Sequence, residues 1–513
     1  MEVETSLWYL LALIPLLYAT IRFLRARRRG SASASHGRPR LPPGPWHLPV
    51  IGSLHHLIGA LPHRALRDLS RRHGPLMLLR LGEVPLMVAS SAEAAREVMK
   101  TQDQVLCTRP LTSCAEVLNQ RGHGITFAPH GDRWRQLRKA CVHALLNAKC
   151  VRSFRRIREE ATARFIRSIA SSSFESQEAM NLSRMIAEYG ADTTVHSVMG
   201  ARFKEQDALL HYVDEAVRVV GCLTVSDLFP SWRLLRVLSG TLRRAAAFRD
   251  SSLAFMERFI VEHLERRASL HLPMPEEDDV IQVLLSIQRQ GNLQFPISMD
   301  NVKAVLFDIL GGGSEAPATM LQWVMAELMQ NPSVMSRAQA EVRHAFMGKR
   351  EVTEEGLGEL SYLQCVIKET LRLHSIGPLL LPRECQEPCT ILGYDVPRGT
   401  VVIVNNWAIS RDPKYWDQPE TFIPDRFMGS ATNYKGTNFE FTPFGAGRRI
   451  CPGMLFGLAN VELGLASLLF YFDWELPDGF LPGALDMTEA MGITARRKED
   501  LFLHATLRVP LPC

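Results

Sequence analysis

A cysteine near the C-terminus lies in a glycine-rich loop that is typical of reactive or metal-binding thiols. The segment Phe444–Gly453 reads Phe-Gly-Ala-Gly-Arg-Arg-Ile-Cys-Pro-Gly, with the thiol at Cys451. Three glycines allow tight turns, and Pro452 suits the first turn of a following helix, where backbone N–H groups lower the pKa of a thiol. Such a thiolate can be a nucleophile, a metal ligand or an ordinary buried cysteine. The absence of an adjacent histidine weakens the nucleophile hypothesis.

Two further pairs have the spacing of neighbours on a helix. Glu369 and Arg372 are one helical turn apart and can form an ion pair. Alone, such a pair is usually a solvated surface feature. Trp134 and Arg138 are four residues apart and share one helix face, where they can form a cation–π pair.

Together these motifs resemble the cytochrome P450 superfamily. Its haem-binding signature, Phe-x-x-Gly-x-Arg-x-Cys-x-Gly, is met at every fixed position by Phe444–Gly453. Glu369 and Arg372, followed by Arg426 in Pro-Asp-Arg-Phe, are similar to the family's network that locks the core behind the cysteine loop. Asp425 stands where many members carry Glu. The resemblance covers nearly the whole chain and is nearest to the plant A-type group.

The resemblance implies a fold and a cofactor. The fold is mainly α with small β-sheets, and the cofactor, haem b (iron protoporphyrin IX), lies between the helix Ser298–Met329 and the loop of Cys451, which is the implied iron ligand. Buried propionate carboxylates need hydrogen-bonded or charged partners. The implied cofactor-binding residues around the porphyrin and its propionates are Trp134, Arg138, Arg383, Phe444 and Arg449.

The oxygen-activation motif departs from the family pattern. The family shows a small residue, Gly, any residue, an acid and then Thr, whereas this chain reads Gly-Gly-Ser-Glu-Ala over 312–316. In the usual mechanism the acid and the hydroxyl organise water and deliver the protons that oxygen activation consumes. Glu315 is therefore the candidate acid, and the hydroxyl missing at Ala316 is replaced by Thr319, by an ordered water or by a hydroxyl of the substrate. Pro317 predicts a kink in this helix.

Substrate contacts are implied in four segments: Arg109–Phe127, Ala304–Gly312, Ile376–Leu380 and Met491–Thr494. Their candidate residues are apolar, which favours a small lipophilic substrate: Leu111, Val117, Phe127, Ala304, Leu379, Leu380, Met491 and Ile493. Resemblance to plant A-type members favours a terpenoid, with indolic, phenolic or amino-acid-derived substrates as alternatives.

Periodicity predicts the elements that position these residues. Strands are expected on both sides of a turn between Gly74 and Ser91 and within Thr390–Val404. Apolar residues at three and four spacing predict helices over Trp134–Ala148, Val151–Ala170, Leu253–Arg267, Val280–Arg289, Ser298–Met329, Val334–Phe346 and Gly453–Phe472.

The N-terminus predicts a single-pass anchor in the endoplasmic reticulum membrane. Thr5–Ile21 is uncharged and mostly apolar, close to the ~18 to 20 residues that span a bilayer. Acids precede it and five arginines follow within 22–29, which keeps the rest of the chain cytosolic. A cleaved signal peptide would need a basic segment first. The expected divisions are an anchor with its basic stop-transfer (1–29), a tether with a proline-rich elbow (30–45) and a haem-thiolate catalytic domain (46–513).

Composition agrees with one large globular domain. The chain has 513 residues, 46% of them hydrophobic and 22% charged, which excludes a disordered or fibrous protein. Much of the net charge of +5 lies near the N-terminus, which favours a membrane surface over nucleic acid. Ten scattered cysteines indicate reduced, cytosol-facing thiols.

Three functions are compatible with these residues. The leading one is a monooxygenase that takes NADPH electrons from NADPH–cytochrome P450 reductase, docked on a basic face with Arg135, Lys139 and Arg448 as candidates. The second is an oxygen-independent haem-thiolate isomerase or dehydratase, suggested by Ala316. The third is a non-catalytic haem-binding or scaffold protein. The standard cysteine loop argues against the second, because family branches that rearrange peroxides typically alter this loop.

Overall fold

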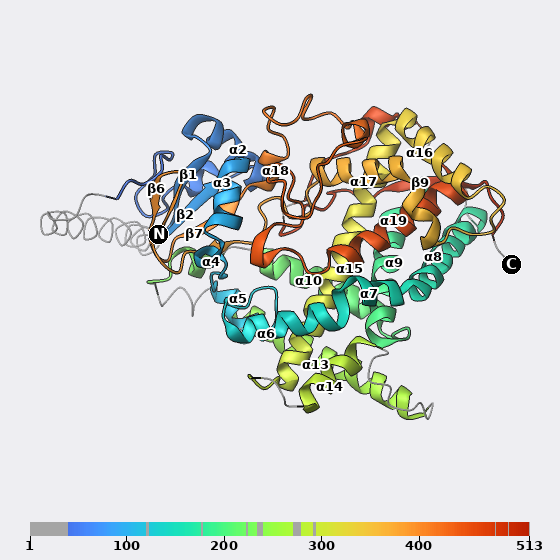
Figure 1. Cartoon of the computed structure of the whole chain (residues 1–513), viewed down its shortest axis with the longest axis horizontal. Helices are drawn as coiled ribbons and strands as arrows, with labels where there is room; N and C mark the ends of the chain where they lie inside the picture. The colour runs from blue at the N-terminus through green and yellow to red at the C-terminus, as the bar shows by residue number, and fades with distance from the viewer. Residues whose placement is uncertain are drawn as a thin grey trace, which may run out of the picture.

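The computed structural model describes residues 39–118, 123–175, 178–221, 224–232, 240–269, 279–290, 294–477, 479–490 and 492–511. The predicted anchor, most of the tether and the substrate candidate Met491 lie outside these residues. Helices fill most of the molecule, and the largest sheet lies at the end that carries the N-terminal part (Figure 1).

The largest sheet joins the N-terminal hairpin to the middle of the chain. β1 (Leu76–Leu81) and β2 (Val84–Ala89) form the predicted hairpin, and the strand order is β1-β2-β7-β4. β7 (Val401–Val404) is parallel to β2, and β4 (Arg383–Glu384) is antiparallel to β7. The remaining sheets are β5 (Cys389–Ile391) with β6 (Tyr394–Val396), and β3 (Met180–Asn181) with β9 (Phe502–Leu507) and β8 (Phe472–Glu475).

Several helices were not singled out by the periodicity, and the longer ones among them are α2, α9, α10 and α17. The α-helices are α2 (Pro62–His73), α3 (Ala92–Arg96), α4 (Asp103–Leu106), α5 (Ser113–Leu118), α6 (Asp132–Cys141), α7 (Ala148–Ser153), α8 (Arg155–Glu175), α9 (Leu182–Met199), α10 (Gln206–Gly221), α11 (Val225–Leu228), α13 (Thr241–Ser269), α14 (Val280–Gln290), α15 (Met299–Gln330), α16 (Pro332–Ala345), α17 (Ser361–Leu373), α18 (Asn406–Ile409) and α19 (Met454–Tyr471).

The helix predicted over Trp134–Ala148 is present but ends two residues earlier than expected, at Leu146. α6 ends at Cys141 and continues as a π-helical stretch, and Asn147 then starts α7 by accepting hydrogen bonds from the backbone N–H groups of Lys149 and Cys150. An Asn side chain that caps a helix start stabilises a new helix at that point. The segment Val151–Ala170 is likewise divided, because α7 ends before α8 begins.

The long helix α15 forms the centre of the fold. Ser298 caps its first turn by accepting from the backbone N–H of Asn301, and the helix runs unbroken through Pro317. α9 packs so closely against it that a Cβ at Gly190 would lie 2.7 Å from the carbonyl oxygen of Ser314. The ring of Pro317 faces α19, 3.6 Å from where a Cβ of Gly457 would be. Apolar side chains of α8, α9, α15, α16, α17 and α19 make one continuous core.

α19 carries the chain away from the cysteine loop into this core. Of the helices in the described ranges, α19 alone is long and apolar enough to cross a membrane, but most of it is buried inside the protein. It is therefore a core helix, and it gives the cysteine loop a rigid support.

Candidate active site

The cysteine loop has a tightly constrained backbone. The N–H of Cys451 donates to the carbonyl of Phe444 at 2.9 Å, which closes the loop. Gly445 and Gly447 have φ angles of 69° and 70°, in the left-handed region that favours glycine. A Cβ at Gly447 would lie 2.2 Å from the carbonyl oxygen of Met99. Two of the three glycines in Phe444–Gly453 are therefore required by the backbone.

The predicted position of Cys451 at the N-terminus of a helix, with Pro452 in the first turn, is wrong. α19 begins at Met454 with Gly453 as its N-cap, so Pro452 precedes the cap. The Cys451 side chain is accessible to solvent, yet protein atoms surround most of it, and this desolvation raises the pKa of its thiol. The backbone N–H of Gly453 and the charge of Arg138 lower the pKa, but by less. A bound cation would favour the thiolate form of Cys451.

Arg449 lies in the protein interior behind Cys451. Its guanidinium donates to the carbonyls of Cys107 at 2.7 Å and Ala128 at 2.6 Å, and it lies 4.0 Å from the centre of the Trp134 ring. The indole N–H of Trp134 donates to the carbonyl of Ile125 at 2.9 Å. Burial lowers the pKa of Arg449 to about 10.

Three more arginines surround the same region. Arg138 donates to the carbonyl of Ile450 beside the cysteine, and Arg383 donates to Ala446 of the loop at 3.1 Å. Arg109 is buried and donates to the carbonyls of Leu381 and Pro382, both at 2.8 Å. Burial and the charges of the other three arginines lower the pKa of Arg109. Sequence reasoning included Arg109 only as the start of a substrate segment, because no helical spacing connects it to the others.

The charge of this arginine cluster fits a cofactor with two carboxylates. In the described part of the chain, the one acid bonded to the four arginines is Asp103, which accepts from Arg383 at 2.8 Å. Asp103 also accepts from the backbone N–H of Arg448 at 2.8 Å. Nε2 of His130 is buried near the cluster without a partner among the described residues, and the ring lies 5.4 Å from that of Trp134. Excess buried positive charge beside an accessible thiol matches the propionates and iron of haem.

Glu369 and Arg372 lie in the interior rather than on the surface. Both side chains are fully buried, and two hydrogen bonds of 2.8 Å join them. Arg426 donates to Oε1 of Glu369 at 3.0 Å, so one carboxylate holds two arginines. Arg372 also donates to backbone carbonyls of the segment before Arg426, those of Ser410, Pro419 and Thr421. Asp425 points elsewhere and pairs with Arg337 on the surface.

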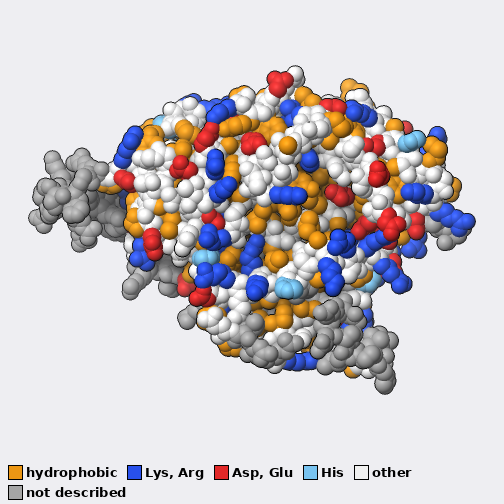
Figure 2. Space-filling model, viewed as in Figure 1, with side chains coloured by type: hydrophobic (Ala, Val, Ile, Leu, Met, Phe, Trp, Pro, Cys, Tyr) orange, Lys and Arg blue, Asp and Glu red, His pale blue; other side chains and the backbone are white. Residues whose placement is uncertain are grey.

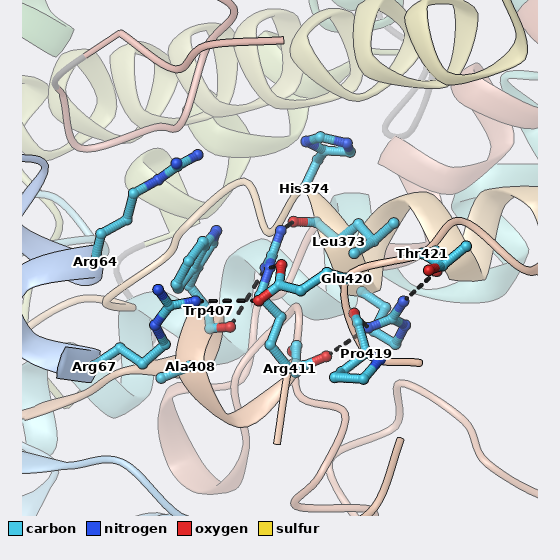
Figure 3. Close-up of polar contacts among 12 residues, drawn as sticks. Arg64, Arg67, Leu373, His374, Trp407, Ala408, Arg411, Pro419, Glu420 and Thr421 are labelled. Atoms are coloured by element: carbon cyan, nitrogen blue, oxygen red, sulfur yellow. Dashed lines mark hydrogen bonds and ion pairs between the residues drawn. The ribbon is translucent and has the colours of Figure 1, made fainter. Parts of the chain in front are cut away.

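Arg411 is a second buried cation close to this network (Figure 3). Arg411 donates to the carbonyl of Leu373 and to Glu420, the latter at 3.0 Å. Its guanidinium lies 4.0 Å from the centre of the Trp407 ring, and Arg67 lies 4.8 Å from the same ring. Burial lowers the pKa of Arg411 to about 10. These contacts tie α2 and α18 to the end of α17, behind the cysteine loop.

The candidate acid Glu315 is bound by four donors. The hydroxyls of Thr319 and Thr494 each donate to Oε1 at 3.1 Å, and Arg496 donates to both carboxylate oxygens. Thr319 thus lies beside the acid, as its spacing of four residues allows, and Ala316 contributes no hydroxyl. Sequence reasoning missed Thr494 as a hydroxyl donor and Arg496 entirely, because both lie about 180 residues further along the chain.

The substrate candidates occupy different environments. Ala304 on α15, Val117 on α5 and the loop residues Phe127 and Ile493 are half-buried, whereas Leu111 is 45% exposed. Leu379 packs beside the core between α2 and the sheet, and Leu380 packs on the cluster that includes Ala446. Leu380 has φ 49° and lies 3.9 Å from where a Cβ of Gly445 would be.

The loop before Phe127 is fastened to α15 by Asp308. Its Oδ2 accepts from the backbone N–H groups of Ile125 at 2.7 Å and Thr126 at 3.1 Å. A Cβ at Gly124 would lie 2.5 Å from the same oxygen, so glycine permits this close approach. Burial raises the pKa of Asp308, and the two N–H bonds oppose the shift.

Replacing Asp308 should therefore release this loop. Asp308→Ala leaves two N–H groups without their acceptor, at a cost of about 1 to 3 kcal/mol. We expect the amides of Ile125 and Thr126 to exchange with deuterium faster in Asp308→Ala, while Asp308→Asn keeps an acceptor oxygen and protects them. If the two amides exchanged at the same rate in the wild type, Asp308→Ala and Asp308→Asn, Asp308 would not be what holds this loop.

Comparison with known proteins agrees with this geometry. The chain belongs to the cytochrome P450 family, whose model matches residues 42–500. It is 47% identical to desmethyl-deoxy-podophyllotoxin synthase of Sinopodophyllum hexandrum, with 91% of this chain and 92% of that protein aligned. It is 46% identical to 5-epiaristolochene 1,3-dihydroxylase of Nicotiana tabacum (96% and 97% aligned) and 44% identical to premnaspirodiene oxygenase of Hyoscyamus muticus (96% and 97%).

The fold comparison gives the same result. A solved zebra fish cytochrome P450 with progesterone aligns with a TM-score of 0.74 at 25% identity, over 88% of this chain and 100% of that one. The predicted family and the mainly α fold with small sheets are confirmed. The chain is a cytochrome P450 monooxygenase, and its family implies a haem-thiolate centre, a redox partner and a small substrate.

Proposed function

We propose that this monooxygenase holds haem b through Cys451 and oxidises a small terpenoid. The observation that supports the haem site is the accessible thiol of Cys451 beside the buried side chains of Arg109, Arg383 and Arg449 and the half-buried side chain of Arg138. Bound there, haem supplies an iron centre that activates dioxygen with two electrons. The net reaction is RH + O2 + NADPH + H+ → ROH + H2O + NADP+.

The residues of the chain hold and orient this site. Arg138, Arg383 and Arg449 would bind the propionates and neutralise their charge in a desolvated place, and Trp134 would contribute an indole N–H donor. Glu315 and the hydroxyls beside it hold the protons that the reaction consumes.

The substrate assignment rests on the apolar candidate residues and on the relatives. The matched relatives include 5-epiaristolochene 1,3-dihydroxylase, premnaspirodiene oxygenase and dolabradiene monooxygenase. An apolar lining recognises a hydrocarbon skeleton by shape and burial rather than by hydrogen bonds. The candidate residues from α5, α15 and the loops are apolar, which supports the proposal of such a lining.

We propose that residues 1–29 anchor the enzyme in the endoplasmic reticulum membrane and that the reductase docks on the face near the cysteine. Of the candidate cations, Arg135 pairs with Asp132 and Arg448 with Asp103 at 3.2 Å. Figure 2 shows Lys and Arg side chains distributed over one face of the molecule among Asp and Glu. Such a mixed surface suits transient, salt-sensitive docking.

The proposal is tested in microsomes that contain this protein and a plant reductase. Terpene and phenolic compounds, with 5-epiaristolochene and premnaspirodiene among them, are supplied with and without NADPH under oxygen-18 gas. We expect a terpenoid product that requires NADPH and carries one labelled oxygen atom. An oxidised phenolic with no terpenoid product would contradict the substrate assignment, and a product formed without NADPH would contradict monooxygenation.

Ala316 gives a separate prediction. A threonine at this position restores a hydroxyl one residue after Glu315, so Ala316→Thr should improve proton delivery. We expect less hydrogen peroxide per NADPH consumed, by about twofold to tenfold, since general acid–base contributions of this kind are substantial. Ala316→Val, which has the shape of Thr without the hydroxyl, is the control. An equal peroxide yield in wild type and Ala316→Thr would argue against a proton-delivery role for this position.

A further inference from the structure

Arg496 connects the acid Glu315 to a helix that lies outside the oxygen-activation motif. Its Nε and one terminal nitrogen donate to the two carboxylate oxygens of Glu315 on α15. Its other terminal nitrogen donates to Oδ1 of Asp214 on α10 at 2.7 Å. The Glu315 side chain is 14% exposed and that of Asp214 49%. The Arg496–Glu315 pair is thus better shielded from water than the Arg496–Asp214 pair. Charge pairing is stronger in such a shielded place.

The segment that presents Arg496 is held by backbone contacts on several sides. The indole N–H of Trp323 on α15 donates to the carbonyl of Ala495 at 2.7 Å. The N–H of Ala495 donates to Ile376 at 2.9 Å, and the carbonyl of Arg496 itself accepts from Ala490 at 2.9 Å. The guanidinium therefore approaches Glu315 from a fixed backbone, so little conformational entropy is lost when the pair forms.

α10 meets this segment at two points on one face. Asp214 binds Arg496, and one turn later Val217 lies 3.8 Å from where a Cβ of Gly492 would be. Residues three apart share a helix face, so the contacts fix the rotation of α10 about its axis. A change in the position of α10 must then change the position of Arg496.

Arg496 also restricts what Glu315 can do. Oε1 accepts from Arg496 and from the hydroxyls of Thr319 and Thr494, and Oε2 accepts from Arg496. A bidentate guanidinium sets the plane of a carboxylate, which a lysine ammonium cannot do. The two hydroxyls are therefore presented to one oxygen of a carboxylate whose orientation is set by Arg496.

We propose that Arg496 is the positioning residue of Glu315 and that Asp214, by holding the other arm of Arg496, couples α10 to proton delivery. The inference rests on the proposed role of Glu315. Arg496 does not transfer the proton itself; it holds the acid and its hydroxyl partners in one arrangement. Loss of Arg496 leaves Glu315 free to rotate, and loss of Asp214 loosens Arg496.

The test uses the full-length holoenzyme with reductase in microsomes, first without a substrate and then with 5-epiaristolochene. Two reactions compete: O2 + NADPH + H+ → H2O2 + NADP+, and O2 + 2 NADPH + 2 H+ → 2 H2O + 2 NADP+. Only the second reaction breaks the O–O bond, so only this reaction depends on additional protons delivered to the oxygen. The measured quantity is the share of consumed oxygen that is recovered as hydrogen peroxide.

Four variants separate positioning from a structural role. We expect Arg496→Gln to raise the peroxide share about threefold, since positioned proton donors contribute effects of this size or larger. If the wild-type share is already high, we expect the share of Arg496→Gln to approach all of the consumed oxygen. The peroxide share of Arg496→Lys should lie between those of the wild type and Arg496→Gln. Asp214→Asn should raise the share less, and the double variant should match Arg496→Gln alone, because both changes act through one group. Lys498→Gln, which removes an exposed charge from the same segment, should have no effect.

A second readout does not depend on turnover. Arg496→Gln should accelerate amide exchange in 492–497 and in α10 while the carbon monoxide difference spectrum keeps its thiolate form. The proposal is overturned by an unchanged peroxide share in Arg496→Gln, by additive effects of the two substitutions, or by a wild-type enzyme that releases all its oxygen as peroxide under both conditions. A shifted share without any terpenoid product would instead contradict the substrate assignment alone.

Discussion

Cys451→Ser should abolish monooxygenation while leaving the fold of the loop intact. Serine has nearly the same shape, and the bond that closes the loop runs between backbone atoms of Cys451 and Phe444. The alkoxide that would replace the thiolate is a much stronger base and stays protonated, so the iron loses its anionic sulfur ligand. We expect product formation to fall by roughly 100-fold or more, because groups at the reacting centre commonly contribute this much.

The carbon monoxide difference spectrum checks this result, because it reports the ligand opposite carbon monoxide. The thiolate form should disappear in Cys451→Ser, with circular dichroism unchanged. Cys150→Ser is the matched control, since Cys150 is a half-buried free cysteine on α7. A thiolate spectrum that survives in Cys451→Ser, or is lost in Cys150→Ser, would show that another cysteine binds the iron.

Local spacing predicted the contacts that lie within one helix. Glu369 and Arg372 pair as their separation of three residues allows, and Thr319 reaches Glu315 across four. The start of α7 could also have been predicted, because Asn147 is a residue type that caps helices. Cys451 shows the limit of this reasoning. The predicted start of the helix at Gly453 lies one residue from the start of α19, but the expected direction of the pKa shift is wrong, because desolvation of the thiol, which spacing does not reveal, outweighs the nearby N–H group.

Contacts between distant segments could not be read from spacing. Arg496 reaches Glu315 only because backbone bonds to Trp323 and Ile376 hold its segment over α15. Arg109 joins the other arginines because its own donors reach the chain just before Arg383. In both cases, loop backbone rather than a periodic element positions the charge, and loop backbone carries no repeating signal in the sequence.

Arg372→Ala should prevent most of the chain from accumulating as folded holoenzyme. The substitution removes the closest cation from a fully buried carboxylate and takes a donor from three carbonyls, those of Ser410, Pro419 and Thr421, of which Thr421 still accepts from Arg426. Removing one partner of a buried ion pair costs about 3 to 5 kcal/mol. Folded proteins are stable by only about 5 to 15 kcal/mol, so this loss is a large part of the total.

The fraction of total protein that binds carbon monoxide in its thiolate form measures this outcome. Arg372→Lys keeps a charge but cannot donate to both carboxylate oxygens and the carbonyls together, so it should fall between wild type and Arg372→Ala. Arg337→Ala is the control, because Arg337 pairs with Asp425 where both side chains are about half exposed, and exposed pairs contribute little. A wild-type yield from Arg372→Ala would mean that Arg426 alone compensates Glu369 and that the three carbonyls find other donors.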